Sequence, residues 1–324
     1  MRYNNILETI GNTPIVKLNR VTRDIKATIL AKIEFFNPGG SIKDRIAVYM
    51  VKDAEKSGLL RPGGTIVETT SGNTGIGLAM YGAIKGYKVL VATSDRISQE
   101  KASLLKALGA KVIICPVDVP PDSPESCYEV AKRVARETPN SLLVNQFFNK
   151  KNIEAHYMTT GPEIWEQTKG KLDYIVIGAG TGGTISGVGK FLKEKNPEIN
   201  VIAVDPIGSI YYDYFKHKKV IKPEMYQIEG IGEDMLPETM DFSVIDDMIQ
   251  VSDKDAFLMA RRLLREEGIF AGGSSGAAVW ASLKVAKDLS EDKIVLTILP
   301  DGGYNYLSKI YNNGWMKEKG FIQY

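Results

Sequence analysis

The chain has 324 residues, enough for one large or two modest domains. Hydrophobic residues make up 44% of the chain and the formal net charge is only +2, which is typical of a soluble globular protein and does not favour nucleic-acid binding. The longest apolar runs, such as YIVIGAG and KIVLTIL, are too short to span a membrane, and the N-terminus shows no apolar signal core. These features predict a cytoplasmic protein that binds neither nucleic acid nor membranes.

Few side chains are available for metal or thiol chemistry. Cys115 and Cys127 stand without a second pair of cysteines, and His156 and His217 are the only histidines. Structural zinc sites need four such ligands, and disulfides are rare in cytosolic proteins. We therefore expect no metal site and no disulfide, and a histidine-based triad is not favoured.

Strand-length apolar runs alternate with amphipathic helical patterns along the first half of the chain. The first strand is predicted at 27–35, and the first helix at 43–58, where the apolar spacing is near 3.6 and Gly58 provides a stop. The same alternation continues through four strands and three helices. The strands are predicted at 65–70, 88–94, 111–117 and 141–147, and the helices at 72–86, 98–109 and 123–140.

A second alternation of the same kind follows residue 150. Helices are predicted at 153–169, 184–195, 253–268 and 274–290, and strands at 172–178, 200–205 and 293–299. Ser98 and Ser123 are the expected N-caps of their helices, with Pro124 in the first turn of the second. Residues 206–250 contain several glycines and prolines and are predicted to form an irregular, functional loop system.

Repeated strand–helix units predict an α/β fold. Because a parallel sheet is covered by helices on both faces, two such series indicate two domains, each a mostly parallel twisted sheet flanked by helices. A cleft between the two domains is expected to hold the functional site.

One lysine lies where a predicted helix begins. The segment NPGGSIKDRIAVYM (37–50) places Lys43 one turn into the helix, after two glycines and a serine. The helix macrodipole is positive at this end, so it disfavours an ammonium group. This position suits a lysine that must react as a neutral amine. The alternative is an ordinary solvated surface lysine.

The segment LDYIVIGAGTGGTISG contains Gly178, Gly180 and Gly183 in G-x-G-x-x-G spacing, between a predicted strand and a predicted helix. With Asp205 at the end of the next strand, this pattern fits a dinucleotide-binding fingerprint. It also fits a phosphate cup, because residues 180–184 offer main-chain N–H groups and two threonine hydroxyls at a helix start. A tight turn without a ligand is the third interpretation. The long α/β stretch that precedes the motif counts against NAD.

Three further turns combine glycine with polar side chains. FAGGSSGAA places Ser274 and Ser275 at a helix start, and ILPDGG ends a strand with Pro300 and Asp301. ETTSGNTGIGLA offers hydrogen-bond donors that suit a carboxylate, namely Thr70, Ser71, Asn73 and Thr74. Each turn alone predicts little. Together with Lys43 they are compatible with a site for a phosphorylated ring cofactor that carries an aldehyde, and for an amino acid.

The motifs NPGGSIKDR, TSGNTGIGLA, GTGGTISG, EGIGEDMLP and GGSSGAA follow one another over nearly the whole chain. In this order they resemble the fold type II pyridoxal-phosphate enzymes, the tryptophan synthase β family, and within it the cystathionine β-synthase and cysteine synthase group. The resemblance implies a large cofactor-phosphate domain of residues 1–40 and 147–324 and a smaller, mobile substrate-carboxylate domain of residues 41–146. It also implies pyridoxal 5'-phosphate in the interdomain cleft and a homodimer.

The resemblance assigns roles to individual residues. It implies that Lys43 carries the cofactor in an imine bond, that Asn73 bonds the pyridine hydroxyl and that Ser274 contacts the ring nitrogen. The remaining cofactor-binding residues it implies are Gly180, Thr181, Gly182, Gly183, Thr184, Pro300 and Asp301. The implied substrate-binding residues are Thr70, Ser71, Gly72, Asn73, Thr74, Gln146 and Gly230.

The implied reaction is a β-replacement or β-elimination on L-serine or L-cysteine through an aminoacrylate. Freed from the cofactor, Lys43 is a base for the Cα proton. A serine rather than an aspartate at the ring nitrogen leaves the pyridine uncharged, which favours elimination over transamination. A thiol or water then adds, and cysteine as donor releases hydrogen sulfide.

The sequence shares features with two members of the group. EGIGEDMLP and DSPES are similar to the cystathionine β-synthase core, whereas TTGPEIW and Phe147 are more like cysteine synthase. Glu229 and Asp234 predict acid–base roles with a hydroxide or thiol leaving group, although both would also suit a solvated loop edge. No cysteine- or histidine-containing segment precedes residue 10 and no regulatory repeats follow the core, so we expect no haem and no S-adenosylmethionine regulation.

Three alternatives stay open. The first is O-acetylserine sulfhydrylase, that is, cysteine synthase. The second is a NAD-dependent dehydrogenase, which depends on Gly178, Gly180 and Gly183. The third is a non-catalytic relative that uses the same fold to bind a partner.

Overall fold

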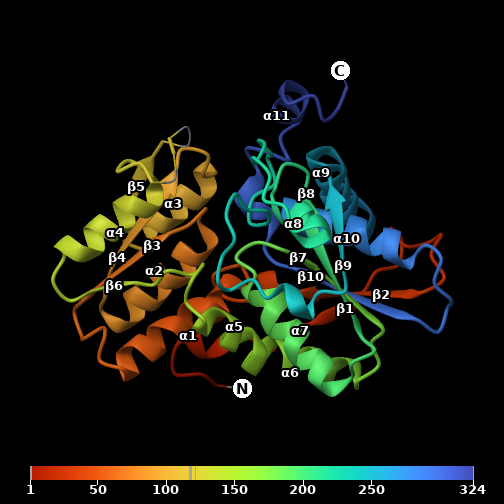
Figure 1. Ribbon diagram of the computed structural model, residues 1–324, viewed down its shortest axis with the longest axis horizontal. Coiled ribbons are helices and arrows are strands. Elements are labelled where there is room, and N and C mark those ends of the chain that lie inside the picture. The colour runs from red at the N-terminus through yellow and green to blue at the C-terminus, as the bar shows by residue number, and fades with distance from the viewer. Residues whose placement is uncertain (1, 117–118, 121, 324) are drawn as a thin grey trace.

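Two sheets of mostly parallel strands form the frame of the computed structural model, which describes residues 2–116, 119–120 and 122–323 (Figure 1). The smaller sheet has the strand order β5-β4-β3-β6, and all its strands are parallel. The larger sheet has the order β1-β2-β10-β7-β8-β9, in which β1 alone runs antiparallel to its neighbour. This arrangement confirms the predicted α/β class with two sheets flanked by helices.

The smaller sheet and its helices are built from the first half of the chain. Its strands are β3 (Thr65–Thr69), β4 (Lys88–Ser94), β5 (Lys111–Cys115) and β6 (Ser141–Leu143). Its helices are α1 (Lys43–Lys56), α2 (Asn73–Lys85), α3 (Gln99–Ala107) and α4 (Cys127–Glu137). Ile66, Tyr81 and Val91 belong to the apolar core between these layers, because a parallel strand buries both of its faces under helices.

The larger sheet takes its strands from both ends of the chain. They are β1 (Ile15–Lys17), β2 (Thr28–Ile33), β7 (Tyr174–Gly178), β8 (Asn200–Pro206), β9 (Asp247–Val251) and β10 (Ile294–Leu299). The α-helices are α5 (Lys151–Ala155), α6 (Gly161–Thr168), α7 (Gly183–Lys195), α8 (Tyr211–His217), α9 (Asp253–Arg262), α10 (Gly273–Ala286) and α11 (Asn313–Glu318). Short 3-10 and π turns complete the chain: η1 (Ile6–Thr9), η2 (Glu34–Phe36), η3 (His156–Thr160), η4 (Phe242–Val244), η5 (Leu263–Glu267) and η6 (Gly303–Tyr306).

The strand β7 shows why its sequence is apolar without interruption. Ile175 and Ile177 belong to the apolar cluster that includes α6 and α7, whereas Val176 belongs to the cluster that includes α9 and α10. Successive side chains of a strand point to opposite faces, so a strand covered on both sides needs apolar residues at every position.

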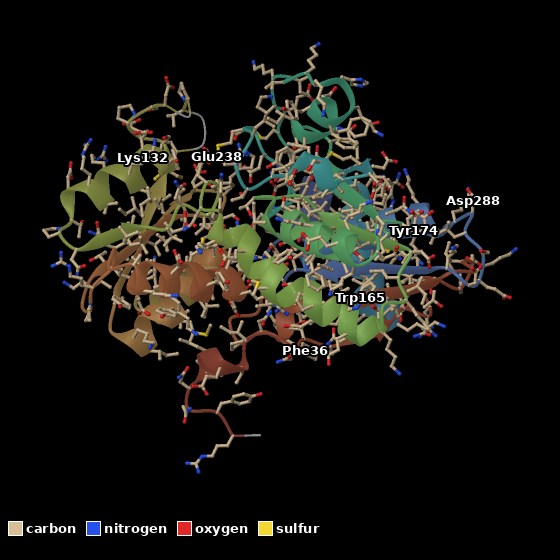
Figure 2. The ribbon with its side chains drawn as sticks, turned by 60° about the horizontal axis from the view of Figure 1, so that its bottom comes forward. Phe36, Lys132, Trp165, Tyr174, Glu238 and Asp288 are labelled. Atoms are coloured by element: carbon tan, nitrogen blue, oxygen red, sulfur yellow. The ribbon has the colours of Figure 1, made fainter. Side chains whose placement is uncertain are left out.

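The two sheets occupy opposite ends of the molecule. Figure 2 shows Lys132 on α4 at the end formed by the smaller sheet and Asp288, after α10, at the other end, with Glu238 between them in this view. In the larger sheet β7 lies between β10 and β8, while α7 connects β7 to β8. The carboxyl end of β7 therefore lies at a switch point of the strand order, where ligands of α/β proteins bind.

Of the two predicted N-caps, one is confirmed and one is wrong. Ser98 caps α3, since its Oγ accepts a hydrogen bond from Lys101 N at 3.3 Å. The prediction for α4 is wrong, because Ser126 is its N-cap and accepts from Glu129 N at 3.2 Å. Ser123 lies in the preceding turn, where its carbonyl accepts from Ser126 N at 2.9 Å, so the proline that follows it is outside the helix.

Other differences concern irregular turns and short strands. The predicted helix 153–169 consists of α5, η3 and α6 in succession, and the predicted helix 253–268 ends in the π turn η5. Within 206–250, which we predicted to be irregular, the structure has α8 and the strand β9, and the three-residue strand β1 was also not predicted. Residue 117, the last of the predicted strand 111–117, lies outside the described residues. Over the described part of the chain, no helix is long and apolar enough to cross a membrane.

Candidate active site

Lys43 is the first residue of α1, and the start of this helix is fixed to the end of β10. Ile42 N donates to the Pro300 carbonyl at 2.8 Å, and Ser41 pairs with Asp301 in an isolated antiparallel bridge. Lys43 N donates to Ser41 Oγ at 3.2 Å. The lysine is therefore held where the helices of the smaller sheet meet the carboxyl edge of the larger one.

Ion pairs of Arg45 anchor the first turn of α1 to the larger sheet. Its Nε lies 2.7 Å from Glu34 Oε2, and its Nη1 lies 2.7 Å from Glu163 Oε1. Lys32 Nζ completes the cluster at 3.0 Å from Glu163 Oε2. Because Glu34 lies next to β2 and Glu163 lies on α6, these buried ion pairs fix the direction of α1, and with it Lys43, to the larger sheet.

Burial lowers the pKa of the Lys43 amine, while the carboxylates of Asp301 and Glu233 act in the opposite direction. The positive end of α1 also disfavours the ammonium form. The site therefore favours the neutral amine that nucleophilic chemistry requires.

A pocket opens beside Lys43. Gly230, Ile231 and Pro300 are among the residues that line it. The turn between β7 and α7 contributes most of the remaining wall, with Gly178, Gly180, Thr181, Gly182, Thr184 and Ile185.

The β7–α7 turn forms a cup of free main-chain donors. Among the described residues, none accepts a hydrogen bond from the main-chain N–H groups of residues 180–184. The cup is closely packed from behind: a Cβ on Gly180 would overlap the Gly230 carbonyl oxygen, and one on Gly182, whose φ is 89°, would lie 2.5 Å from Met240 Cα. Free N–H groups at the positive end of α7 bind a phosphate group well.

The hydroxyls of the cup are held by buried partners. Asn152 Nδ2 donates to Thr181 Oγ1 at 3.0 Å, and His156 Nε2 lies 3.2 Å from Thr184 Oγ1. The other ring nitrogen of His156 lies 2.9 Å from Thr160 Oγ1. Burial, together with the nearby cations, lowers the pKa of His156 well below its usual value, so the imidazole is neutral. Sequence reasoning missed His156, since a single histidine on a helix carries no distinctive spacing.

The geometry fits a phosphate monoester better than a dinucleotide. Asp205, which the NAD interpretation needs beside the ribose, is fully buried. Its Oδ2 accepts from Tyr212 N at 3.0 Å, and burial raises its pKa to about 7. A fully buried carboxyl group that is bonded to the main chain is not accessible to a ribose, so the G-x-G-x-x-G spacing here favours a phosphate cup.

Asp301 connects the starts of three helices. Beyond the bridge between its backbone and Ser41 before α1, its carbonyl accepts from Gly272 N before α10 at 3.0 Å. Its Oδ2 accepts from Asn73 Nδ2 at the start of α2 at 2.8 Å. Ser274, in the first turn of α10, is buried next to this junction. The predicted ring-contacting residues thus come together at one place, although they lie on different helices.

The predicted carboxylate-binding loop is also assembled. Thr74 Oγ1 donates to Gln146 Oε1 at 2.6 Å, and Gln146 Nε2 donates to the Thr69 carbonyl at 3.1 Å. Beneath them, Glu68 accepts from Gln146 N at 3.1 Å and from Thr69 N at 2.8 Å, and burial raises its pKa to about 8. Glu68, which sequence reasoning missed, therefore holds the two segments of the loop together.

The other loop residues differ in exposure. Thr70 Oγ1 accepts from Gly72 N at 3.1 Å, and Gly72 has a φ of 127°, which a side chain would strain. Ser71 is exposed, and Gly230 lines the pocket. Of the predicted substrate-binding residues, Gly230 is therefore part of the wall beside Lys43 and the phosphate cup.

The three acids of the 228–237 loop differ from one another. Glu229 pairs with Lys101 at 2.8 Å and with Lys309 at 2.5 Å. Burial acts to raise the pKa of Glu229, but the two ammonium groups outweigh it and the pKa is lowered. Asp234 is exposed. Glu233, which sequence reasoning missed, is partly buried, and burial and the neighbouring Asp234 raise its pKa to about 8.

No group of three or more histidine, cysteine or acidic side chains is placed to hold a metal ion within the described ranges. Cys115 and Cys127 are both free thiols. The free main-chain donors at the start of α7 instead suit a phosphate group.

Comparisons with known proteins agree with this geometry. The family model described as "Pyridoxal-phosphate dependent enzyme" matches residues 6–301. Cystathionine beta-synthase of Apis mellifera is 50% identical over 321 residues, which are 98% of this chain and 63% of the relative. Cysteine synthase 1 of Emericella nidulans is 43% identical over 322 residues, which are 98% of this chain and 87% of the relative. The chain thus spans less than two thirds of the cystathionine beta-synthase that it matches.

Two solved structures share the fold. The crystal structure of O-ureido-L-serine synthase has a TM-score of 0.89 and 39% sequence identity, and the match covers 97% of this chain and 96% of the other. A hydrogen sulfide-producing enzyme from Fusobacterium nucleatum has a TM-score of 0.88 and 36% identity, over 94% of this chain and 100% of the other. The chain belongs to the family of pyridoxal-phosphate dependent enzymes, and within it to the cystathionine β-synthase and cysteine synthase group.

Proposed function

We propose that the protein catalyses β-replacement or β-elimination on L-serine or L-cysteine, with a thiol or water as the second substrate and with hydrogen sulfide released from cysteine. One observation carries the proposal: Lys43, with a lowered pKa, lies beside a phosphate cup whose main-chain donors have no partner among the described residues. The likeness to cystathionine beta-synthase, cysteine synthase and a hydrogen sulfide-producing enzyme supports the same reaction type.

Different residues of the site would hold different parts of the cofactor. Residues 180–184 would bind its phosphate, Ser274 would contact the ring nitrogen, and Asn73 would direct an N–H at the ring hydroxyl. Pro300 would contact the cofactor beside Lys43, since both residues line the pocket. When bound, pyridoxal phosphate supplies an aldehyde for attachment and a ring that withdraws electrons from Cα.

The chain's own groups would bind the amino acid and move its protons. The hydroxyls and N–H groups of residues 70–74 bind the substrate carboxylate, and Gln146 fixes their arrangement. Lys43 Nζ, neutral in this site, takes the proton from Cα. We propose that residues 41–146 move as a unit to close this part of the site over the substrate. The separate sheet of this segment supports that proposal.

We propose roles for two acids at the β-carbon. Glu233, which is protonated at neutral pH because its pKa is about 8, donates a proton to the departing thiolate or hydroxide. Asp234, whose side chain is exposed, accepts the proton of the incoming thiol or water. Glu229 forms ion pairs with two lysines, so we assign it a structural role in these pairs and no acid–base role.

Product analysis tests the proposed reaction. The purified protein is incubated with cysteine alone, with cysteine plus homocysteine, and with serine plus homocysteine. We expect hydrogen sulfide from both mixtures that contain cysteine, and a thioether amino acid wherever homocysteine is present. The absence of turnover with every donor would contradict the proposal and favour a non-catalytic relative.

The second candidate is O-acetylserine sulfhydrylase, which the 43% identity to cysteine synthase 1 of Emericella nidulans favours. The same assay with O-acetylserine and sulfide distinguishes it. If kcat/KM for O-acetylserine exceeds that for serine and for cysteine, the second candidate holds.

We also propose that the protein is a cytoplasmic homodimer. Apolar side chains on the surface support self-association: Phe36 is 65% exposed, and Val16 and Ile6 are also exposed. Figure 2 shows Phe36 on the outer surface of the molecule. Light scattering coupled to gel filtration measures the mass, and a monomer would contradict the proposal.

A further inference from the structure

Lys101 of α3 is buried, although a lysine on a surface helix usually extends into solvent. Its stem runs beneath Gly72 of the substrate loop, where a Cβ would lie 2.7 Å from Lys101 Cδ. Its Nζ donates to Glu229 Oε2 at 2.8 Å and to the Tyr306 hydroxyl at 2.9 Å. A lysine from the smaller sheet's layer of helices therefore ends among residues that belong to the larger sheet.

The hydrogen-bond chain continues from Lys101 to Asn73. The Tyr306 hydroxyl donates to Asp301 Oδ2 at 2.6 Å, and Asn73 Nδ2 donates to the same oxygen at 2.8 Å. An ammonium group has only donors, so the Tyr306 oxygen must accept from Lys101 and give its own proton to Asp301. Asp301 Oδ2 then acts as the acceptor that orients the Asn73 amide.

The orientation of this amide decides whether an N–H group or the carbonyl oxygen of Asn73 faces the cofactor. Nδ2 is bound to Asp301, and Oδ1 accepts from Asn305 Nδ2 at 3.4 Å, so both contacts favour the same orientation of the amide. The second N–H, which also interacts with the Tyr306 side chain, would donate to an oxygen of the ring. If the amide were flipped, Asn73 Oδ1 would face that oxygen and repel it. The charge-assisted bonds around Asp301 are stronger than neutral ones and hold one orientation.

We propose that Lys101 is a positioning residue of the active site, whose ammonium group sets the direction of the hydrogen bonds through Tyr306 and Asp301 and thereby presents the Asn73 N–H to the ring hydroxyl of the cofactor. The inference deepens the proposed function and rests on it. Lys101 touches no reacting atom in this scheme and acts through Tyr306 and Asp301.

The charges of the cluster agree with this role. Lys101 and Lys309 carry two positive charges, and Glu229 and Asp301 carry two negative ones, so the buried and partly buried charges of the group are balanced. Burial raises the pKa of Asp301, and the Lys101 ammonium opposes this effect. Without that ammonium group, Asp301 would take up a proton more readily and become a donor, so that the Asn73 N–H would lose its acceptor.

The test compares the absorbance of the cofactor-loaded protein in three variants. Lys101→Met keeps the stem beneath Gly72 and removes the charge, and Lys101→Arg keeps the charge. Lys309→Met removes the other cation of Glu229, whose ammonium group bonds to Glu229 and the Arg96 carbonyl but not to the Tyr306 hydroxyl. In Lys101→Met we expect the ratio of visible to near-ultraviolet absorbance to fall about tenfold, the change that the loss of one charge-assisted hydrogen bond produces in an equilibrium. The ratio is expected to stay near that of the parent protein in the other two variants.

The outcomes separate positioning from a structural role. An unchanged ratio in Lys101→Met, or the same fall in Lys309→Met, overturns the proposal. If Lys101→Met does not fold, Tyr306→Phe interrupts the same chain while it leaves the Lys101–Glu229 pair in place, and an unchanged ratio there also overturns it. A parent protein that shows the visible band but turns over no donor contradicts the proposed function. It does not contradict the positioning role of Lys101, because the spectra of the variants can still be compared.

Discussion

Asn73 and Asp301 are bonded side chain to side chain, Nδ2 to Oδ2 at 2.8 Å, although 228 residues separate them in the chain. Asn73 begins α2, and the backbone of Asp301 is bonded to the residues just before α1 and α10. The positive ends of three helices therefore converge beside the phosphate cup at the start of a fourth, α7. This convergence creates a site for an anionic ring cofactor.

Replacing Asp301 by asparagine tests this convergence. Asp301→Asn keeps the shape but removes the charged acceptor of Asn73 and Tyr306, so we expect the affinity for pyridoxal phosphate to fall about tenfold. Titration of the cofactor-free protein, followed by absorbance, measures it. The matched control is Asp288→Asn at an exposed position, seen in Figure 2. Equal affinities in both variants would contradict the role of Asp301.

A glycine pair tests the phosphate cup. Gly182 and Gly109 have similar backbone conformations, with φ of 89° and 85°, but a Cβ on Gly182 would meet Met240, whereas one on Gly109 would meet nothing within 4 Å. Gly182→Ala should therefore displace the cup and weaken cofactor binding, while Gly109→Ala adds only backbone strain elsewhere. The same titration checks this, and a similar loss in both variants would show that the cup is not the binding site.

The buried charges around Arg45 make a prediction about stability. Arg45→Met leaves the buried Glu34 without its main partner and the partly buried Glu163 with Lys32, so the free energy of unfolding should fall by about 3–5 kcal/mol. Removing Lys293 from its partly exposed pair with Asp173 should cost only about 0–1 kcal/mol. Urea denaturation of the cofactor-free variants measures both. The account of α1 anchoring is wrong if the two costs are equal.

Glu233 predicts a pH dependence with a definite sign. Burial and Asp234 raise its pKa from 4.5 to about 8, so between these values the folded protein holds a proton that the unfolded chain has released. The contribution of Glu233 to the free energy of unfolding therefore falls as the pH rises through this window, and it levels off above the folded-state pKa. Glu233→Gln removes this effect, so the variant should gain stability relative to the parent protein from about pH 5 to about pH 8.

Thermal denaturation of both proteins across this pH range measures the difference, with Glu238→Gln on the exposed part of the same loop as the control. A stability difference that does not change with pH would mean that Glu233 is ionised throughout, and it would remove the basis for its proposed role as a proton donor.

Local patterns in the sequence predicted the frame of the molecule well. The apolar run of β7 and the serine that caps α3 depend only on neighbouring residues, and both predictions are confirmed. The N-cap of α4 failed because SPES contains two candidate serines, and the choice between them depends on which one reaches a free N–H, here that of Glu129. The strand β9 was missed because its five residues lie within a stretch rich in glycine and proline.

The candidate site was predictable where one turn supplies all of its groups. Residues 180–184 form such a turn, and Lys43 lies at a recognisable helix start. The roles of Lys101 and Glu233 were not predictable, because they depend on partners far along the chain: Glu229 follows Lys101 by 128 residues. Helical periodicity alone places a lysine such as Lys101 on the solvent side, and only the packing of α3 against η6 buries it.

The central claim is that the Lys43 amine holds the cofactor. Borohydride reduction of the loaded protein, followed by peptide mass spectrometry, fixes the cofactor on the lysine that carries it. We expect the label on Lys43 alone and a Lys43→Ala variant without the visible absorbance band. A label on any other lysine, or a visible band that persists in Lys43→Ala, would contradict the account.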